Sequence, residues 1–206
     1  MEGQTDMKTF RTLRRLLTLS LLSCAAPVAA WAHPDIAITA RLFFDVKAGR
    51  LTMIAESFAF DAAHSRRLLD LYDGNADGAF DAGEMAALGR SLAEDLEPLG
   101  YFTEMRQAGR ALPLPAPAAF HATSQAGIVT ITLGFRLDAP LDVTEGRTVE
   151  LVLRDRDYTA AFRLTEATPV ILRGGEGACG YRLQDRPDLA FFGGLVVPQA
   201  IVLSCR

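Results

Sequence analysis

The twelve residues from Asp73 to Glu84 constrain the fold more than any other segment, because their pattern requires a helix on each side. They read D-G-N-A-D-G-A-F-D-A-G-E, which is the spacing of an EF-hand calcium loop. Gly78 falls at position six, where the chain must turn sharply. Oxygen donors occupy the ligand positions, with a backbone carbonyl at position seven and a bidentate glutamate last: Asp73, Asn75, Asp77, Ala79, Asp81 and Glu84. Hard oxygen donors suit Ca²⁺, so the segment predicts a calcium site.

The flanking residues predict the two helices that such a loop needs. Asp61 is expected to cap a helix that runs to about Tyr72. After the loop, apolar residues recur at i, i+3 and i+4 spacing, and Pro98 with Gly100 ends that second helix; these apolar residues are Met85, Leu88, Leu92 and Leu96. The helix-loop-helix is therefore expected to be an insertion over residues 61–97, with Phe80 holding the loop against a core.

A second interpretation of the same residues needs no metal. Asp81 and Glu84 alone form a D-x-x-E box that caps a helix start, and an ordinary polar turn would use Asp73, Asn75 and Gly78. Neither alternative accounts for all the acids, the asparagine and the glycine at once. Because a single loop lacks the paired loop that would stiffen it, we expect weak calcium affinity, roughly 10⁻⁴ to 10⁻³ M, and a structural role.

The N-terminal segment predicts export. Basic residues precede a short apolar stretch, and Ala30-Trp31-Ala32 is an A-x-A cleavage site. We therefore interpret residues 1–32 as a signal peptide and residues 33–206 as a single periplasmic domain. The alternative is a lipoprotein-like sequence that ends in Cys24 and would leave a lipid anchor there. The formal net charge of the whole chain is −4, which argues against nucleic acid as a partner.

Cys179 and Cys205 remain after cleavage at the A-x-A site. An even number of cysteines in an oxidising compartment predicts a disulfide between them. The loop that this bond closes has about 25 residues, which corresponds to roughly 3–4 kcal/mol in the chain-entropy model. Two free thiols are the alternative.

Short alternating apolar segments predict strands through the rest of the chain. Four hairpins are expected, and their strands are residues 36–44 with 50–60, 101–106 with 110–114, 119–123 with 128–137, and 148–154 with 158–164. Shorter strands follow at 170–172, 180–183 and 198–204. This pattern indicates an α+β fold, in which the EF-hand-like helix-loop-helix is inserted into an antiparallel β-sandwich-like domain.

The order of several short motifs resembles that of a family of bacterial exported proteins. The motifs are His33-Pro34 after the cleavage site, Phe58-Ala59-Phe60-Asp61, the acidic loop, Gly100-Tyr101-Phe102-Thr103, and Arg154-Asp155-Arg156-Asp157-Tyr158. Members of that family are described as periplasmic components of an unassigned ABC-type transport system. Their genes often lie beside nickel/cobalt-type permeases or zinc-related loci. The resemblance implies a metal-transport setting, with an inner-membrane metal permease or ABC-type transporter as partner.

The chain also departs from that family at its first residues. Members typically begin His-Pro-His, whereas this chain has His33-Pro34-Asp35. The amine and imidazole of His33 could still chelate a transition metal such as Ni, Co, Zn or Cu. Because Pro34 has no N–H, a further ligand must come from elsewhere, and the candidates are Asp35, His64 and His121.

Two classes of function follow from these observations. The first is a non-catalytic periplasmic accessory or binding protein linked to Ni/Co/Zn-type transport, with one calcium loop; a calcium-stabilised adaptor for a permease is its close variant. The second is a copper enzyme that uses His33. The catalytic motifs of hydrolases and zinc proteases do not appear, and the acid pair Asp155 and Asp157 is expected to lie in a hairpin turn. We therefore expect no enzyme.

Overall fold

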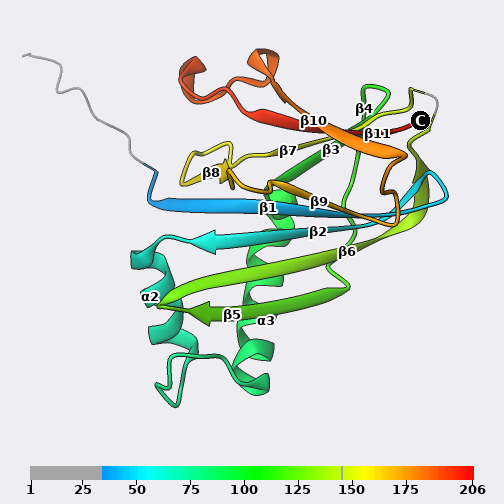
Figure 1. The fold of residues 1–206 in the computed structure, drawn as a ribbon. Coiled ribbons are helices and arrows are strands. Elements are labelled where there is room, and N and C mark those ends of the chain that lie inside the picture. The colour runs from blue at the N-terminus through cyan, green and yellow to red at the C-terminus, as the bar shows by residue number, and fades with distance from the viewer. Residues whose placement is uncertain (1–33, 145) are drawn as a thin grey trace, which may run out of the picture. The chain divides into compact units, whose positions relative to one another are not determined.

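The computed structural model describes residues 34–206 except Glu145. The predicted signal peptide, Cys24 and His33 lie outside the described residues. These residues form two β-sheets and the helices α2 and α3, as drawn in Figure 1. In chain order the elements are β1 Ile36–Lys47, β2 Arg50–Phe60, α2 Ala62–Tyr72, α3 Ala82–Leu96, the 3-10 segment η1 Glu97–Phe102, β3 Thr103–Gln107, β4 Arg110–Leu112, β5 Ala119–Gln125, β6 Ile128–Asp142, β7 Val149–Leu153, β8 Ala160–Leu164, β9 Val170–Arg173, β10 Cys179–Asp185, η2 Pro187–Leu189, η3 Phe192–Gly194 and β11 Gln199–Cys205.

The strands divide into two sheets. Sheet A has the order β5-β6-β2-β1-β8, and β9 continues the same edge beside β1. Sheet B has the order β10-β11-β7-β3-β4. Pairing is antiparallel except at β1, where β8 and β9 both run parallel to it. The structure is therefore an α+β protein of the sandwich-like kind that the strand pattern predicts.

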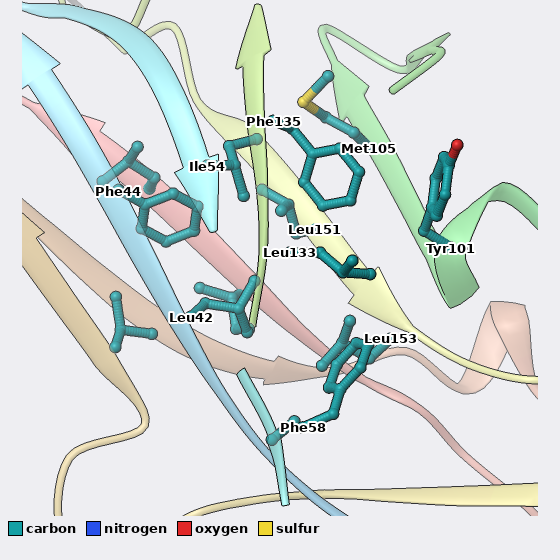
Figure 2. Packing of buried hydrophobic residues seen from close by; sticks show 14 of the residues in the cluster. Leu42, Phe44, Ile54, Phe58, Tyr101, Met105, Leu133, Phe135, Leu151 and Leu153 are labelled. Atoms are coloured by element: carbon teal, nitrogen blue, oxygen red, sulfur yellow. The ribbon is translucent and has the colours of Figure 1, made fainter. Parts of the chain in front are cut away.

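One apolar cluster fills the space between the two sheets (Figure 2). Alternate residues of β1 and β2 point into it, because side chains in a strand alternate between the two faces. Leu42 and Ile54 come from sheet A and Leu151 from sheet B, and all three are completely buried. The Tyr101 and Phe135 rings lie 5.2 Å apart between their centroids, which joins η1 to β6.

The two helices pack against the β5–β6 side of sheet A (Figure 1). Leu88 of α3 is fully buried in the core. The next residue, Gly89, permits close contact, since a Cβ there would lie 2.8 Å from Cδ1 of Phe120. The buried Ser65 hydroxyl donates to the Phe60 carbonyl at 3.2 Å and accepts from the Val129 amide at 2.9 Å. These contacts fix the helix pair, and therefore the loop between the helices, on the sheet.

The fourth predicted hairpin is wrong. Residues 148–154 contribute β7 to sheet B, whereas residues 158–164 contribute β8 to sheet A. The buried Asp155 carboxylate redirects the chain, since it accepts hydrogen bonds from the amides of Asp157 at 3.1 Å and Ala160 at 2.9 Å. The strand that follows joins the edge of β1 in parallel, with Ile36 opposite Ala160. Asp155 therefore shapes a crossover between sheets, and not a hairpin turn.

The other three hairpins are confirmed, and each of them turns on the dipeptide Ala-Gly. Both residues have positive φ at Ala48-Gly49, Ala108-Gly109 and Ala126-Gly127, as in a type I′ turn. This conformation suits glycine but strains alanine. The second hairpin begins later than predicted, at Thr103, because Gly100, Tyr101 and Phe102 are also left-handed.

The exchange Ala126→Asn should stabilise the protein by about 0.5–1 kcal/mol, because asparagine tolerates the left-handed region better than alanine. The free energy of unfolding in urea would measure the gain. Gly127→Ala is the matched opposite change. It has open space for a Cβ but a φ of +76°, so it should destabilise the protein. Equal effects of the two exchanges would contradict the strain argument.

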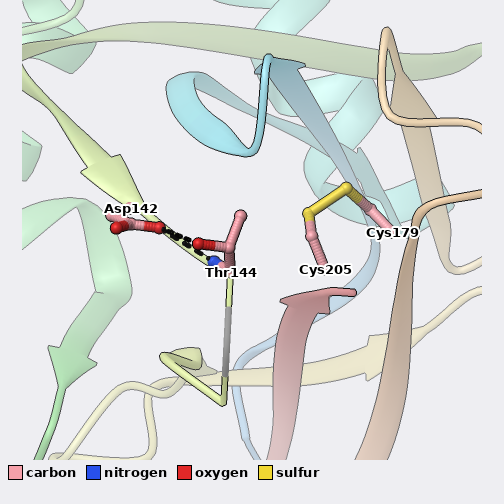
Figure 3. Close-up of a disulfide and its surroundings, with 4 residues drawn as sticks. All are labelled: Asp142, Thr144, Cys179 and Cys205. Carbon is pink, nitrogen blue, oxygen red and sulfur yellow. Dashed lines mark hydrogen bonds between the residues drawn. A yellow bond between two sulfur atoms is a disulfide. The ribbon is translucent and has the colours of Figure 1, made fainter.

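The predicted disulfide joins Cys179 to Cys205 at the ends of β10 and β11 (Figure 3). The Cys205 amide donates to the Val143 carbonyl at 2.6 Å, which ties the last strand to the connection between β6 and β7. The C-terminal apolar segment ends in β11, most of which is buried. Within the part of the chain that the structure describes, no helix has both the length and the apolarity needed to cross a membrane.

Candidate metal site

The acidic loop lies between two helices, as predicted. Helix α2 ends at Tyr72, where the Asp73 amide makes the last helical bond, to the Leu69 carbonyl at 2.9 Å. Helix α3 begins at Ala82. Between them the backbone turns back twice through left-handed residues, at Ala76 with φ of +58° and at Gly78 with φ of +83°. This path folds the acidic side chains toward the amides of the loop itself.

The first half of the loop is organised around Asp73. One carboxylate oxygen accepts from the Asp77 amide at 3.2 Å and the other accepts from the Gly78 amide at 2.8 Å. The Asn75 side-chain oxygen also accepts from the Asp77 amide, at 2.9 Å. Asp77 in turn accepts from the Ala79 amide at 2.9 Å. These bonds hold the oxygens at positions one, three and five on the inner side of one tight turn.

Glu84 connects the end of the loop to its beginning. Its Oε1 accepts from the Gly74 amide at 2.7 Å and from the Asn75 amide at 3.3 Å. Its Oε2 accepts from the Asp81 amide at 2.9 Å, while Asp81 Oδ1 accepts from the amides of Gly83 and Glu84. The capping box of the second interpretation is therefore present. The same glutamate also does more than cap, because it closes the twelve-residue loop.

The donors that surround this loop have the chemistry that calcium requires. Carboxylates from positions one, five, nine and twelve, one side-chain amide oxygen and one carbonyl give the six or more oxygen ligands that Ca²⁺ takes. In the arrangement described, those carboxylates are engaged with loop amides. Accordingly, no three His, Cys, Asp or Glu side chains converge closely enough to hold a metal ion among residues 34–144 and 146–206.

The loop is anchored to the core by apolar residues on both sides. Phe80, at position eight, packs against the central cluster as predicted, together with Tyr72 of α2 and Met85 of α3. Of the acidic residues, Asp77 and Asp81 are exposed, and Asp73 and Glu84 are half-buried. Polar ligands on a short exposed turn with a buried apolar base are an arrangement in which a cation can bind without reorganising the core.

His64, a candidate ligand for a second metal, lies beside the start of β1. The Asp61 carboxylate caps α2 by accepting from the His64 amide at 2.9 Å, and it also accepts from the Ala37 amide of β1 at 2.9 Å. The His64 ring nitrogen Nδ1 lies 3.1 Å from Asp61 Oδ2. Partial burial acts to raise the pKa of Asp61, but these hydrogen bonds lower it below its ordinary value.

The two histidines that the structure describes, His64 and His121, are not brought together. His33 lies outside the described residues. His121 is exposed on β5. It lies opposite Thr132 of β6, which lies opposite Ser57 of β2, and Ser57 lies opposite Arg41 of β1. Three strand spacings separate His121 from β1, which is about 14 Å. His64 is therefore nearer to the N-terminal strand than His121 is, and the pair does not form a shared site.

Sequence reasoning missed one buried ionisable residue. Glu56 on β2 is completely buried. Its Oε1 accepts a hydrogen bond of 2.5 Å from the Thr103 hydroxyl, and its Oε2 has no partner among the described side chains and backbone. Burial raises the pKa of Glu56 to about 8, although the Thr103 bond opposes the change. The sequence alternation could have revealed it, because Ile54, Glu56 and Phe58 are alternate residues of one strand and so share its inward face.

The fold and the loop define an α+β protein with two facing sheets and an acidic helix-loop-helix segment. The chain belongs to the family described as "Protein of unknown function (DUF1007)", which matches residues 18–189. It is also similar to the protein described as "Uncharacterized 15.5 kDa protein in trpE 3'region" from Spirochaeta aurantia. The two are 30% identical over 134 residues, which cover 62% of this chain and 90% of that protein.

Proposed function

We propose that the protein is a non-catalytic, periplasmic accessory or binding protein linked to metal-ion transport, and that its Asp73–Glu84 loop binds one structural Ca²⁺. The observation that carries the calcium part is the closure of the loop by Glu84, which brings the last ligand position to the amide of Gly74 at 2.7 Å. On binding, Ca²⁺ would replace the loop amides as the partner of the carboxylates of Asp73, Asp77 and Glu84.

The transport part rests on the signal-like N-terminus, the disulfide expected of an oxidising compartment, and the resemblance to periplasmic transport components. An inner-membrane permease for Ni, Co or Zn is the partner that this setting implies. Deleting the gene should then change cellular content or tolerance for at least one of these metals. Unchanged metal content and tolerance for Ni, Co, Zn and Cu would rule the transport role out.

Calcium should stabilise the mature chain. For a dissociation constant of 10⁻⁴ to 10⁻³ M, about 10 mM Ca²⁺ should add roughly 1.5–3 kcal/mol to the free energy of unfolding. Urea unfolding of chelator-treated protein, with and without Ca²⁺, would measure this. The same concentration of Mg²⁺ should have a smaller effect, because Mg²⁺ gives up its water reluctantly and demands octahedral geometry.

The variant Glu84→Gln separates metal binding from helix capping. Glutamine can keep the capping-box bond to the Asp81 amide through its oxygen, but its NH2 group cannot accept from the Gly74 amide, so the apo protein should lose about 1 kcal/mol. The Ca²⁺ effect should disappear, since the bidentate carboxylate is lost. Glu94→Gln on the exposed part of α3 is the matched control and should respond to Ca²⁺ normally. If Glu84→Gln and the unaltered protein respond alike, the loop is a capped turn.

The alternative, a copper enzyme based on His33, is favoured by one observation. Asp61 occupies Nδ1 of His64 beside Ala37, and a carboxylate on one ring nitrogen commonly orients a histidine to coordinate through the other. Electron paramagnetic resonance of the mature protein after Cu²⁺ loading tests this. A copper signal that His64→Ala alters would support it, and the absence of any bound-copper signal would remove it.

A further inference from the structure

Strand β10 is an exposed edge of sheet B that carries apolar side chains. Six of its seven residues are exposed. Tyr181 and Leu183 are 38% and 39% exposed. They lie opposite Leu203 and Ile201 of β11, which are buried. Their side chains therefore stand on the core-facing side of sheet B, at the rim of the sandwich, where solvent still reaches them.

The same residues turn their backbone groups to the open edge. At the two ends of the β10–β11 pair, the Arg206 amide donates to Ala178 and the Arg186 amide donates to Pro198. In an antiparallel pair, hydrogen-bonded positions alternate. The even-numbered residues of β10 therefore bond to β11, and the N–H and C=O groups of Tyr181, Leu183 and Asp185 point outward along the edge.

The other sheet edges that the structure describes are better protected. Strand β4 has three residues, and β8 and β9 have five and four. Strand β5 has seven residues, but its exposed face carries the polar side chains of His121, Thr123 and Gln125. Short length and polar side chains are common protections of strand edges. Strand β10 is long, contains no proline, and offers a tyrosine and a leucine.

The disulfide makes this edge rigid before any partner arrives. Cys179, the first residue of β10, is bonded to Cys205 of the neighbouring strand. A strand that is already fixed loses less conformational entropy when a second strand adds to it. The edge is thus prepared for the addition of a strand.

We propose that β10 pairs antiparallel with β10 of a second copy of this chain, about a two-fold axis at Leu183. Charge disfavours the neighbouring register. With Leu183 opposite Leu183 of the other copy, Arg182 faces Gln184 and Tyr181 faces Asp185. With the axis one residue earlier, Arg182 would face Arg182, and directly opposed like charges destabilise a strand pair. The two copies then join their B sheets into one continuous sheet.

Sedimentation velocity of the mature protein over a range of concentrations tests the pairing. A dimer is expected, and Leu183→Lys should raise its dissociation constant at least about tenfold, because it places like charges at the axis. Leu195→Lys is the matched control. Leu195 is the most exposed large apolar residue of the described chain, at 80%, but it lies outside β10, so its exchange should leave association unchanged. A protein that stays monomeric overturns the proposal.

Two single-cysteine variants test the register. Leu183→Cys should form a dimer cross-link under mild oxidation, since paired residues across an antiparallel ladder have Cα atoms within disulfide reach. Arg182→Cys should not, because its mate is Gln184. Cross-linking through position 182 but not 183 would overturn the stated pairing. Both positions are exposed, so the exchanges should not disturb folding.

Discussion

Replacing Glu56 by glutamine should make the protein about 3 kcal/mol more stable at neutral pH. Glu56 is completely buried between the sheets, and burial raises its pKa to about 8. In the unfolded chain the same carboxyl has its ordinary pKa of 4.5. At pH 7 folding therefore requires Glu56 to take up a proton that the unfolded chain does not hold. Glutamine fills the same volume, keeps an oxygen for the Thr103 hydroxyl and needs no proton.

The direction of the pKa shift predicts how the stability of the protein depends on pH. Because the pKa is raised in the folded state, the contribution of Glu56 to stability is fully present below pH 4.5 and is lost as the pH rises through about 8. Between these values the free energy of unfolding should fall by about 1.4 kcal/mol per pH unit on account of this group. Glu56→Gln should lack that slope, and the two proteins should converge at low pH.

Urea unfolding at intervals from acid to mildly alkaline pH would measure both curves. Glu166→Gln removes an exposed carboxylate and serves as the control that keeps the original slope. Parallel curves for Glu56→Gln and the unaltered protein would mean that Glu56 keeps its charge when folded.

Loss of the Cys179–Cys205 bond should cost about 3.5 kcal/mol, because the bond closes a loop with a sequence separation of 26 residues and so restricts the unfolded chain. The double variant Cys179→Ala, Cys205→Ala should show this loss in urea unfolding. It should also be insensitive to a reducing agent, whereas the unaltered protein should lose a similar amount on reduction. A loss of stability below about 1 kcal/mol would mean that the chain-entropy model does not describe this bond.

The consequence should be local as well as global. Cys205 lies at the end of β11, and its amide donates to the Val143 carbonyl. Strand β11 should therefore keep its place in sheet B without the disulfide. Strand β10 has β11 as its neighbour in the sheet, so its amides should show the greatest gain in hydrogen exchange when the bond is absent. Equal gains in β10 and β7 would indicate general loosening of the sheet.

The structural features that were predicted correctly from the sequence are those set by interactions between residues close together in the chain. The β1–β2 hairpin, the α2 cap at Asp61 and the α3 box of Asp81 with Glu84 all follow from interactions within a few residues. The separation of β7 from β8 could not be foreseen in this way. Both segments have strand patterns, and a short connection normally gives a hairpin. The crossover is held by the Asp155 carboxylate through the amides of Asp157 and Ala160, and these bonds form only once the chain has buried Asp155.

The candidate site shows the same division. The candidate ligand positions of the loop were readable from spacing, and the flanking helices and Phe80 lie where that spacing predicts. The reach of Glu84 to the Gly74 amide was not readable, because it depends on how the two helices meet. Glu56 was readable in principle, since it interrupts an inward-facing apolar series at Ile54 and Phe58. Its missing partner on Oε2 could be found only in three dimensions.

The parallel pairing of β1 with β8 and β9 has a consequence for the timing of folding. Leu42 lies beside Val170, so the first strand of the described chain cannot complete its hydrogen bonding until more than half of the sequence has followed it. Such distant contacts slow folding, because the chain must close a long loop before they form. If the N-terminus crosses a membrane first, the edge of β1 that pairs with β8 and β9 stays unpaired until those strands have also crossed. Sheet A is therefore complete only after β9 has emerged, and until then the chain lacks the long-range pairing that finishes its fold.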